Sequence, residues 1–256
     1  MKLSIITINY NNREGLQKTI DSVICQTWRD FEWIIIDGGS TDGSRELIEQ
    51  YQAHFAYWCS EPDKGVYNAM NKGIVKAQGE YLNFMNSGDC FASSTILEKL
   101  FSASYQSDVF YGYMMRKSLN GHPNNARNMH PNIKWYDFYY DTLPHQSSFI
   151  RRTLFDSIGL YDESYKQLAD WKWFATAVVW HQISCEFVPL KISIYECGGI
   201  SDSGIEFELS RLRSEVFPIS VVSDFHSIML VDRIRKNSIL FSSYKILRWI
   251  KRIILN

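Results

Sequence analysis

The stretch Trp33-Ile-Ile-Ile-Asp-Gly-Gly-Ser-Thr-Asp-Gly43 runs from a short apolar segment directly into an acidic turn rich in glycine. Apolar runs of this length that stop at turn residues are typical of buried strands. The segment therefore predicts a strand over 33–36 that ends at Asp37, and a turn over 38–43. The residues after the turn, 44–51, are expected to form a helix. Strand, turn and helix in this order are the beginning of an α/β unit.

Apolar segments of the same kind lie on both sides of this stretch. Residues 3–8 form a short β-rich run, and Asn11 or Asn12 can cap the helix that follows. The apolar stripe of that helix is Leu16, Ile20, Val23 and Ile24. The other elements expected in the first half are strands over 55–59 and 81–85 and a helix over 66–77. Strands that alternate with helices predict an α/β fold with a mainly parallel sheet.

The second half of the chain is less regular. The expected strands cover 108–113, 145–150 and two short pieces of 183–196 around Pro189. The expected helices cover 168–180 and the chain from 206 to its end. Residues 117–131 are polar and rich in Asn, Gly and Pro, which indicates a loop or lid.

The composition is that of a globular chain with an uneven charge. It has 256 residues, 45% of them hydrophobic, which is enough for one large domain or one domain with an appendage. The net charge of −1 gives no general attraction to nucleic acid. Seven basic and no acidic residues follow Asp232, so residues 1–232 carry the other 20 basic residues and all 28 acidic ones, a net charge of −8. Such asymmetry indicates that the tail has a partner of its own.

Cysteine usage and hydropathy both bear on the compartment. The cysteines are Cys25, Cys59, Cys90, Cys185 and Cys197, an odd number without a CxxC pair. This argues against a disulfide framework or a zinc site and for a reducing compartment. The apolar start of the chain is soon interrupted by Thr and Asn, so it is a poor signal peptide. Because no run approaches about 18 apolar residues, we expect no transmembrane helix and a cytosolic protein.

Polar residues follow the predicted strands at the point where each strand ends. Asn9, Asp37, Glu61 and Asp89 all stand at such positions. In open α/β sheets the carboxyl edge of the strands forms the ligand crevice. The alternative is that these residues are polar because they lie in loops.

Asp37 stands at the tip of a buried strand, where a carboxylate can accept a hydrogen bond from a ligand. Uracil N3–H is a suitable donor, whereas cytosine has no proton on that atom. The alternative role is structural, because an aspartate here can cap its own turn through Ser40 or Thr41.

Two further loops carry groups suited to a diphosphate and its metal. Lys64 adds a positive charge just before a predicted helix N-terminus, which favours a pyrophosphate or ribose contact. Gly88 lets the chain turn sharply after the fourth strand, and Asp89 can offer a hard oxygen to Mg²⁺ or Mn²⁺. The alternative for Lys64 is that it lies in an ordinary loop that caps the helix. The alternative for Asp89 is that it only stabilises a turn.

Asp170 lies among Trp171, Trp173 and Phe174 in a predicted helix. Burial in aromatic surroundings raises the pKa of a carboxyl group, which suits a general base. The alternative is that Asp170 caps the N-terminus of the helix or forms an ion pair. His145 can contact a ligand or a metal, although a single histidine more often has a structural role.

A series of segments, taken in order, resembles glycosyltransferase family 2. These segments are Ser4-Ile-Ile-Thr-Ile-Asn-Tyr-Asn-Asn12, Ser22-Val-Ile-Cys-Gln-Thr27, Ile34-Ile-Ile-Asp-Gly-Gly-Ser-Thr-Asp-Gly43, Ser60-Glu-Pro-Asp-Lys-Gly-Val-Tyr-Asn-Ala-Met-Asn-Lys-Gly73, Gly79-Glu-Tyr-Leu-Asn-Phe-Met-Asn-Ser-Gly-Asp89, His145-Gln-Ser-Ser-Phe149, Gly159-Leu-Tyr-Asp-Glu163 and Ala169-Asp-Trp171. Each one alone is weak, but the ordered set is specific and covers roughly residues 3–200. The chain looks most like bacterial transferases that build surface polysaccharides such as colanic acid or O-antigen.

The resemblance implies roles for particular residues. Asp37 takes the position of the uracil-binding aspartate, Asp89 that of the last acid of the metal motif, and Asp170 that of the general base. The residues assigned to the nucleotide sugar are Thr7, Asn9, Asp37, Ser40, Asp63, Lys64, Ser87 and Gly88. His145 is assigned a contact with substrate or metal.

Two positions depart from the family pattern. Ser87 stands where the first acid of an Asp-x-Asp or Asp-Asp metal motif is common, so a single carboxylate would hold the metal only together with the diphosphate. Ala169 precedes the base, where Glu is common, which indicates that this neighbour is not essential to the reaction.

The family implies a fold, a reaction and a division of the chain. The fold is α/β GT-A, with a Rossmann-like, mainly parallel central sheet flanked by helices. We expect a catalytic domain over 1–205, with a nucleotide-sugar half (1–90) and an acceptor half (91–205), and a helical basic extension over 206–256. The implied reaction is inverting transfer of a hexose or N-acetylhexosamine from a UDP-sugar to a hydroxyl of a lipid-linked glycan, with Mn²⁺ or Mg²⁺.

Two other functions are alternatives to a transferase. A UDP-sugar-binding protein without transferase activity would bind UDP but not turn over a donor. A dinucleotide-dependent oxidoreductase needs GxGxxG after the first strand, and this chain has Asn-Tyr-Asn-Asn there instead.

The tail interleaves basic residues with Trp249 and aliphatic residues over 233–256. A basic amphipathic helix with tryptophan can lie on an anionic membrane surface, which suits a lipid-linked acceptor. A helix packed on the catalytic domain, or a homodimer contact, is the alternative. We expect no nucleic-acid partner, and a cytoplasmic protein that is peripheral at the inner face of the membrane.

Overall fold

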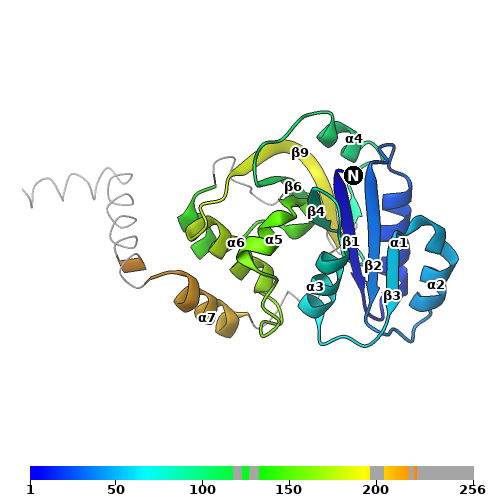
Figure 1. Ribbon diagram of the computed structural model, residues 1–256, viewed down its shortest axis with the longest axis horizontal. Helices are drawn as coiled ribbons and strands as arrows, with labels where there is room; N and C mark the ends of the chain where they lie inside the picture. The colour runs from blue at the N-terminus through cyan, green and yellow to red at the C-terminus, as the bar shows by residue number, and fades with distance from the viewer. Residues whose placement is uncertain (118–122, 127–132, 197–204, 219–221, 224–256) are drawn as a thin grey trace, which may run out of the picture. The chain divides into compact units, whose positions relative to one another are not determined.

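The computed structural model describes residues 1–256 except for 118–122, 127–132, 197–204, 219–221 and 224–256. The chain divides into two compact units, Met1–Leu212 and Arg213–Asn256. The first unit is built around one sheet of nine strands with helices packed on it (Figure 1). The predicted α/β class is therefore confirmed.

The first half of the chain builds a wholly parallel part of the sheet. Its strands are β1 (Leu3–Asn9), β2 (Phe31–Asp37), β3 (Tyr57–Ser60) and β4 (Tyr81–Phe84), in the spatial order β3-β2-β1-β4. The main connecting helices are α1 (Arg13–Ile24), α2 (Ser44–Tyr51) and α3 (Val66–Lys76). Helices α1 and α2 lie on one side of these strands and α3 lies on the other (Figure 1). Every strand and helix predicted for this half is present.

Burial and capping explain why these residues form these elements. Every residue of β1 is buried, as expected for a central strand covered by helices on both faces. Helix α1 begins after Asn12, whose Oδ1 accepts a hydrogen bond from Gly15 N at 3.1 Å. Gly73 of α3 lies so close to Ile6 of β1 that a Cβ would collide with it, so glycine lets this helix approach the sheet.

The second half of the chain adds strands in both directions. They are β5 (Cys90–Phe91), β6 (Val109–Lys117), β7 (Pro123–Ala126), β8 (Ser148–Arg151) and β9 (Cys185–Glu196). Strand β8 pairs antiparallel with β4 and β6, whereas β6 and β9 are parallel. Strand β5 pairs antiparallel with β9, and β7 pairs antiparallel with β6. The sheet is therefore mixed: the first half is wholly parallel as expected, and the second half adds one parallel pair, β6 and β9, among antiparallel pairs.

Two strand predictions for this half are wrong in detail. Residues His145–Ser147 form a short 3-10 helix, η3, and strand begins only at Ser148. Asn83 Nδ2 holds this turn by donating to the carbonyl oxygens of Gln146 and Ser148 at 3.2 and 3.0 Å. Residues 185–196 form one strand rather than two, and Pro189 lies where the register between β6 and β9 shifts. Proline is tolerated there because an irregular strand leaves some N–H positions unpaired.

The predicted loop over 117–131 is also only partly correct. Residues Pro123–Ala126 pair with β6 as strand β7. The neighbouring stretches 118–122 and 127–132 lie outside the described residues.

The helices of the second half are α4 (Ile96–Phe101), α5 (Thr153–Ile158), α6 (Ala169–Val179) and α7 (Glu206–Val216). Two short 3-10 helices are η1 (Gln52–His54) and η2 (Trp135–Tyr139). Helix α6 confirms the helix predicted over 168–180. Helix α7 begins where the predicted extension begins, but its residues up to Leu212 belong to the first compact unit. The predicted continuation to the chain end, with the basic tail over 233–256, lies outside the described residues.

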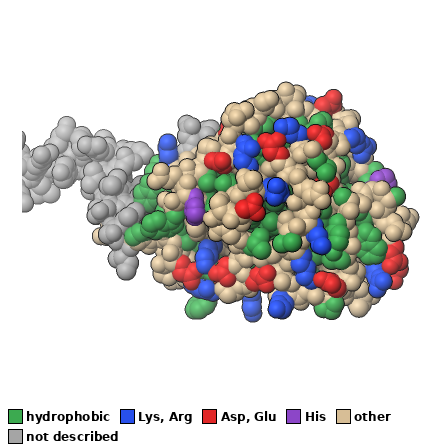
Figure 2. Space-filling view, viewed as in Figure 1, with side chains coloured by type: hydrophobic (Ala, Val, Ile, Leu, Met, Phe, Trp, Pro, Cys, Tyr) green, Lys and Arg blue, Asp and Glu red, His purple; other side chains and the backbone are tan. Residues whose placement is uncertain are grey.

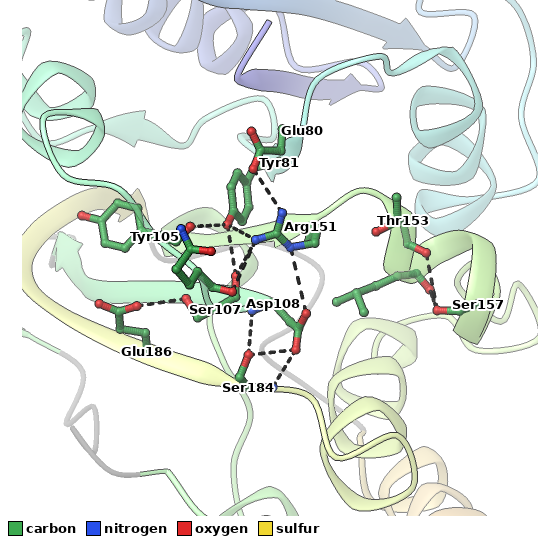
Figure 3. A network of polar contacts seen from close by, with 12 residues as sticks. Glu80, Tyr81, Tyr105, Ser107, Asp108, Arg151, Thr153, Ser157, Ser184 and Glu186 are labelled. Atoms are coloured by element: carbon green, nitrogen blue, oxygen red, sulfur yellow. Dashed lines mark hydrogen bonds and ion pairs between the residues drawn. The ribbon is translucent and has the colours of Figure 1, made fainter.

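A polar network fixes the end of the sheet where β4 begins (Figure 3). Arg151, at the end of β8, donates to Glu80 Oε1 at 3.1 Å and to the Tyr81 hydroxyl at 2.7 Å. Ser184 donates through both its backbone N and its hydroxyl to Asp108 Oδ2, at 2.9 and 2.8 Å. These contacts join segments far apart in the chain at the edge opposite the carboxyl end of β4, so their role is structural.

No helix within the described residues has both the length and the apolarity needed to cross a bilayer. On the face seen in Figure 2, acidic and basic side chains are interspersed rather than gathered in one patch.

Candidate active site

The carboxyl edge of the parallel strands gathers the polar residues that the sequence places after each strand. Asn9 and Asp37, the last residues of β1 and β2, are paired in register. Ser60, the last residue of β3, is paired with Asp37 from the other side. The loop after β4 joins this edge, because Ser87 N donates to Ile8 O at 3.1 Å.

The carboxylate of Asp37 is the centre of the first cluster and is fully buried. It accepts hydrogen bonds from Ser40 Oγ at 2.6 Å, Ser60 Oγ at 2.6 Å and Asn9 Nδ2 at 2.7 Å. The backbone N of Ser40 donates a fourth at 2.9 Å. Burial by itself raises the pKa of Asp37, but these hydrogen bonds outweigh it and hold the pKa below its ordinary value. Asp37 is therefore an ionised acceptor, and it caps its own turn through Ser40, as the structural alternative expected.

Ser87 connects this cluster to the loop that carries Asp89. Its hydroxyl lies 2.8 Å from Asn9 Oδ1 and 3.2 Å from Asn12 O. Asn12 Nδ2 in turn donates to Ser87 O at 3.2 Å. The next residue, Gly88, has φ +103°, a conformation that favours glycine and turns the chain toward Asp89. The serine in the position of the missing acid thus braces the loop against β1 and α1.

Thr7 lies in the core rather than at the edge. Its side chain is fully buried, its Oγ1 donates to Met85 O at 2.8 Å, and it accepts from Trp33 Nε1 at 3.0 Å. We therefore leave Thr7 out of the residues proposed to bind the nucleotide. The sequence could not separate it from Asn9, because residues two apart in a strand share a face.

The loop between β3 and α3 lies beside the Asp37 turn. Asp63 Oδ1 accepts from Gly65 N at 2.8 Å, and the other carboxylate oxygen of Asp63 occupies the space that a Cβ at Gly38 would need. Lys64 is exposed, and its backbone N donates to Asn68 Oδ1 at 3.2 Å in the first turn of α3. Asp63 and Lys64 therefore lie between the Asp37 turn and the N-terminus of α3.

Asp89 is 5% exposed, and its backbone carbonyl is bound by Thr19. The Thr19 hydroxyl donates to Asp89 O at 2.8 Å and accepts from Gly88 N at 3.0 Å. Burial raises the pKa of Asp89 to about 7, although the charge of His145 and a hydrogen bond from Gln146 act against it. The metal-free carboxyl is thus poised between its neutral and ionised forms at neutral pH.

Asp170 forms a second cluster with a tyrosine and a histidine. Tyr67 OH donates to Asp170 Oδ1 at 2.8 Å, and His145 Nδ1 lies 3.1 Å from Asp170 Oδ2. Burial by itself raises the pKa of Asp170, but the hydrogen bond and charge of His145 and the hydrogen bond of Tyr67 outweigh it, so the pKa is lowered. The expectation of a raised pKa is therefore wrong, because polar partners and not the aromatic neighbours decide the balance.

His145 joins the two acidic residues of the second cluster. Its Nε2 lies 3.2 Å from Asn86 Nδ2, on the loop that leads to Asp89, while its Nδ1 faces Asp170. Its charge also acts on Asp89. The imidazole is only 18% exposed, so it is part of the site's interior rather than of the open surface.

Several residues of the site were missed by sequence reasoning. They are Ser60, Tyr67, Thr19, Asn86 and Gln146. Ser60, Tyr67, Asn86 and Gln146 lie inside the segments quoted above, which was the available signal. Their side-chain directions could not be read from those segments.

The chemistry of the loop Asn86–Asp89 fits a divalent cation that brings its own oxygen ligands. Asp89 offers a buried carboxylate, and Asn86 Oδ1 is a buried oxygen without a hydrogen-bond partner in the described part of the chain. Both are hard oxygen donors of the kind that Mg²⁺ and Mn²⁺ prefer. Within the residues described, no three or more His, Cys, Asp or Glu side chains gather as a metal cage. The remaining ligands would be phosphate oxygens and water.

Solved structures show which fold this site belongs to. The structure of S. aureus TarS residues 1–349 in complex with UDP-GlcNAc matches with a TM-score of 0.68 at 19% sequence identity, covering 83% of this chain and 65% of that one. This chain therefore spans about two thirds of the length of that structure, 65%. A mannosyltransferase of Pyrobaculum calidifontis in complex with GDP-Man and Mn²⁺ matches with a TM-score of 0.57 at 15% identity, covering 75% and 56%. The expected GT-A fold, an α/β fold with a curled central sheet, is confirmed.

Sequence comparison then gives the family. The profile of glycosyl transferase family 2 matches residues 4–164. An uncharacterised glycosyltransferase of Mycobacterium tuberculosis is 34% identical over 227 residues, which cover 87% of this chain and 80% of that protein. A PGL/p-HBAD biosynthesis glycosyltransferase of Mycobacterium bovis is 30% identical over 217 residues, covering 82% and 83%. The chain belongs to glycosyl transferase family 2.

Proposed function

We propose that this protein is an inverting, metal-dependent glycosyltransferase that moves a hexose or N-acetylhexosamine from a UDP-sugar to a hydroxyl of a lipid-linked glycan, in the synthesis of bacterial surface polysaccharide. Family membership supports glycosyl transfer. The TarS structures with UDP and UDP-GlcNAc support a UDP-sugar donor. A cholesterol galactosyltransferase of Borreliella burgdorferi, 36% identical over 136 residues that cover 48% of this chain and 38% of that protein, supports an acceptor with a lipid part.

One observation carries this proposal. His145 Nδ1 lies 3.1 Å from Asp170 Oδ2, and Nε2 of the same ring lies 3.2 Å from Asn86 Nδ2, on the loop that carries Asp89. One ring thus connects the loop whose carboxyl group suits a metal and its diphosphate to an ionised carboxylate suited to remove a proton. A transferase needs these two groups on either side of the anomeric carbon. A protein that only bound UDP-sugar would have no use for the second.

In the proposed reaction Asp170 accepts the proton of the acceptor hydroxyl. The hydroxyl oxygen forms a bond to the anomeric carbon while the bond from that carbon to the UDP oxygen breaks, and UDP leaves with the electron pair. Attack from the face opposite UDP inverts the configuration. Asp170 must be ionised for this role, and the lowered pKa supports it. Tyr67 and His145 each occupy one site on a different carboxylate oxygen, so acceptor capacity remains for the hydroxyl.

The donor would lie along the carboxyl edge of the sheet. Asp37 would accept the N3–H of uracil in place of one of the hydroxyl hydrogen bonds that it accepts from Ser40 and Ser60. Asp63 and Lys64 would contact ribose and phosphates near the N-terminus of α3. Asp89 and Asn86 Oδ1 would hold a divalent metal ion, whose positive charge would stabilise the departing diphosphate.

A donor panel tests the proposal. The protein is incubated with Mn²⁺ and one donor at a time, with and without a lipid-linked glycan acceptor, and nucleotide release is measured. The donors are UDP-glucose, UDP-galactose, UDP-N-acetylglucosamine, UDP-N-acetylgalactosamine and GDP-mannose. We expect acceptor-dependent UDP release from one UDP-sugar, and its loss in excess EDTA. Full activity in EDTA would refute the metal requirement. Tight UDP binding without turnover of any donor would favour the binding-protein alternative.

The location of the protein is a further part of the proposal. We place it in the cytoplasm, at the inner face of the membrane, through the basic segment 233–256 that lies outside the described residues. Co-sedimentation with anionic liposomes, with and without that segment, tests this. Equal binding by both forms would remove the membrane role from the tail. A homodimer contact through the tail would appear instead as a change in sedimentation equilibrium.

A further inference from the structure

Glu208, in the first turn of α7, binds the loop that leads into α6. Its Oε1 accepts a hydrogen bond from Lys166 N at 2.6 Å. Its Oε2 accepts from Gln167 N at 3.0 Å and from Leu168 N at 3.1 Å. One carboxylate thus binds three successive backbone N–H groups just before the helix that carries Asp170. Hydrogen bonds to a carboxylate are stronger than those to a neutral acceptor, so this contact fixes the loop firmly.

The peptide between Gln167 and Leu168 is held from both sides. Its N–H, on Leu168, donates to Glu208, while its carbonyl oxygen, on Gln167, lies 2.6 Å from Tyr67 OH, whose single proton is shared between this oxygen and Asp170 Oδ1. The N–H and C=O of a trans peptide point in opposite directions, so the two partners lie on opposite sides of the chain. The same Tyr67 hydroxyl lies 2.8 Å from Asp170 Oδ1. A continuous series of contacts therefore connects α7 to the carboxylate of Asp170.

Arg211 reinforces this contact from the same face of α7, since residues three apart on a helix are neighbours. Its Nη2 donates to Ser164 Oγ at 3.0 Å and lies 3.9 Å from Asp162 Oδ2. Its guanidinium lies 4.3 Å from the centre of the Tyr165 ring. Lys172, in the second turn of α6, closes the group with a 2.7 Å ion pair to Asp162. Helix α7 thus contacts the loop along its length, and Asp162 is bound from both α7 and α6.

We propose that Glu208 is a positioning residue for the transfer reaction: it holds the loop 166–168 in the conformation that places Tyr67 and Asp170 for proton removal. This inference rests on the proposed function, in which Asp170 is the base. It assigns the first turns of α7 a part in positioning the base, although they lie beyond residues 4–164 that match the family profile. Because well-oriented groups supply much of catalysis, a displacement of about 1 Å at a base can cost about 10²-fold in rate.

The first test compares three variants of the full chain. Glu208→Ala removes all three hydrogen bonds, and Glu208→Gln keeps one oxygen acceptor in a side chain of the same size. Glu206→Gln is the matched control, because it removes the same charge from an exposed position on the same helix. We expect kcat to fall by about 10–100-fold in Glu208→Ala and by less in Glu208→Gln, with KM for the UDP-sugar within about twofold. Unchanged kcat in both Glu208 variants would overturn the proposal.

The second test separates positioning from general damage. The double variant Glu208→Ala/Asp170→Asn is compared with Asp170→Asn alone. If Glu208 acts through Asp170, its removal adds no further loss once the base is absent, because effects of residues that act as a unit are not additive. A further loss equal to that of the single Glu208→Ala variant would show that Glu208 acts elsewhere and would overturn the proposal.

The third readout needs no substrate. Hydrogen exchange at the amides of residues 166–168 is measured in the wild type, Glu208→Ala and Glu206→Gln. We expect exchange at least about tenfold faster in Glu208→Ala only, since the three N–H groups lose their acceptor. Equal exchange in all three proteins would contradict the loop contact itself. Faster exchange together with full turnover in Asp170→Asn would instead mean that the base assignment has failed, not the loop contact.

Discussion

His145 Nδ1 lies 3.1 Å from Asp170 Oδ2, and Nε2 of the same ring lies 3.2 Å from Asn86 Nδ2. With a proton on Nδ1 the ring donates to the carboxylate of Asp170, and its Nε2 faces the side-chain amide of Asn86. One ring therefore connects the loop proposed for the metal with the carboxylate proposed as base.

Loss of this ring should change the pH dependence of the reaction. His145 is the main group that lowers the pKa of Asp170, and burial alone would raise it. In His145→Ala that pKa therefore rises, and the ionised base is lost at higher pH as the solution is acidified. We expect the acid limb of the kcat–pH profile, at saturating Mn²⁺ and donor, to move to higher pH, with kcat about tenfold lower near neutrality.

His145→Asn is the control for this prediction. Its amide N can take the place of Nδ1 and donate to Asp170, so part of kcat and of the acid limb should be recovered. Identical profiles for wild type and His145→Ala would show that the histidine does not act on the base.

Asp170→Asn should leave binding intact while removing the base. General-base assistance is typically worth about 10²–10⁴-fold, so we expect kcat to fall by that factor. UDP affinity, measured by calorimetry with Mn²⁺, should stay within about twofold, because Asp170 is joined to His145 and Tyr67 and not to the Asp37 cluster. Wild-type turnover in this variant would remove Asp170 from the role.

Asp37→Asn should alter base preference as well as stability. Asparagine replaces one acceptor oxygen by a donor amide, which faces the hydroxyl and N–H donors now bound to Asp37. We expect the free energy of unfolding to fall by about 1–3 kcal/mol. An amide donor suits cytosine N3 better than uracil N3–H, so the ratio of UDP to CDP affinity should fall at least tenfold. A lower melting temperature with an unchanged ratio would mean that Asp37 only caps its turn.

Asp89→Asn should stabilise the metal-free protein at alkaline pH. Burial raises the pKa of Asp89 to about 7, against an ordinary value of 3.8. The unfolded chain therefore loses this proton at lower pH than the folded protein, and folding becomes less favourable as pH rises from about 4 to about 7. Asparagine cannot ionise, so we expect a gain on the order of 2–4 kcal/mol at pH 8 and little change at pH 4. Denaturant melts in EDTA at both pH values measure this, and a destabilised variant at pH 8 would contradict a strained carboxylate.

Much of the first half could be predicted from local pattern. The strands ending at Asn9 and Asp37, and the caps and stripes of the helices between them, depend on neighbours in sequence. The mistakes lie where distant segments decide. Pro123–Ala126 became a strand because β6 offers it an edge, and His145 left the predicted strand because Asn83 holds its turn.

The sequence by itself determined which polar residues stand at the carboxyl edge of the sheet, because hydrophobic periodicity sets where each strand ends, and parallel strands end at the same edge. Only the tertiary structure decided what each side chain does there. The Thr7 side chain lies in the core, where it accepts a hydrogen bond from Trp33. The pKa of Asp170 is lowered, because His145, 25 residues away in the chain, together with Tyr67 has a larger effect than the burial expected from the aromatic neighbours. Glu208, which we propose as a positioning residue, lies on a helix outside the family match. Hydrogen bonds and pKa values depend on distances through space, and for residues far apart in the chain those distances are set only by packing.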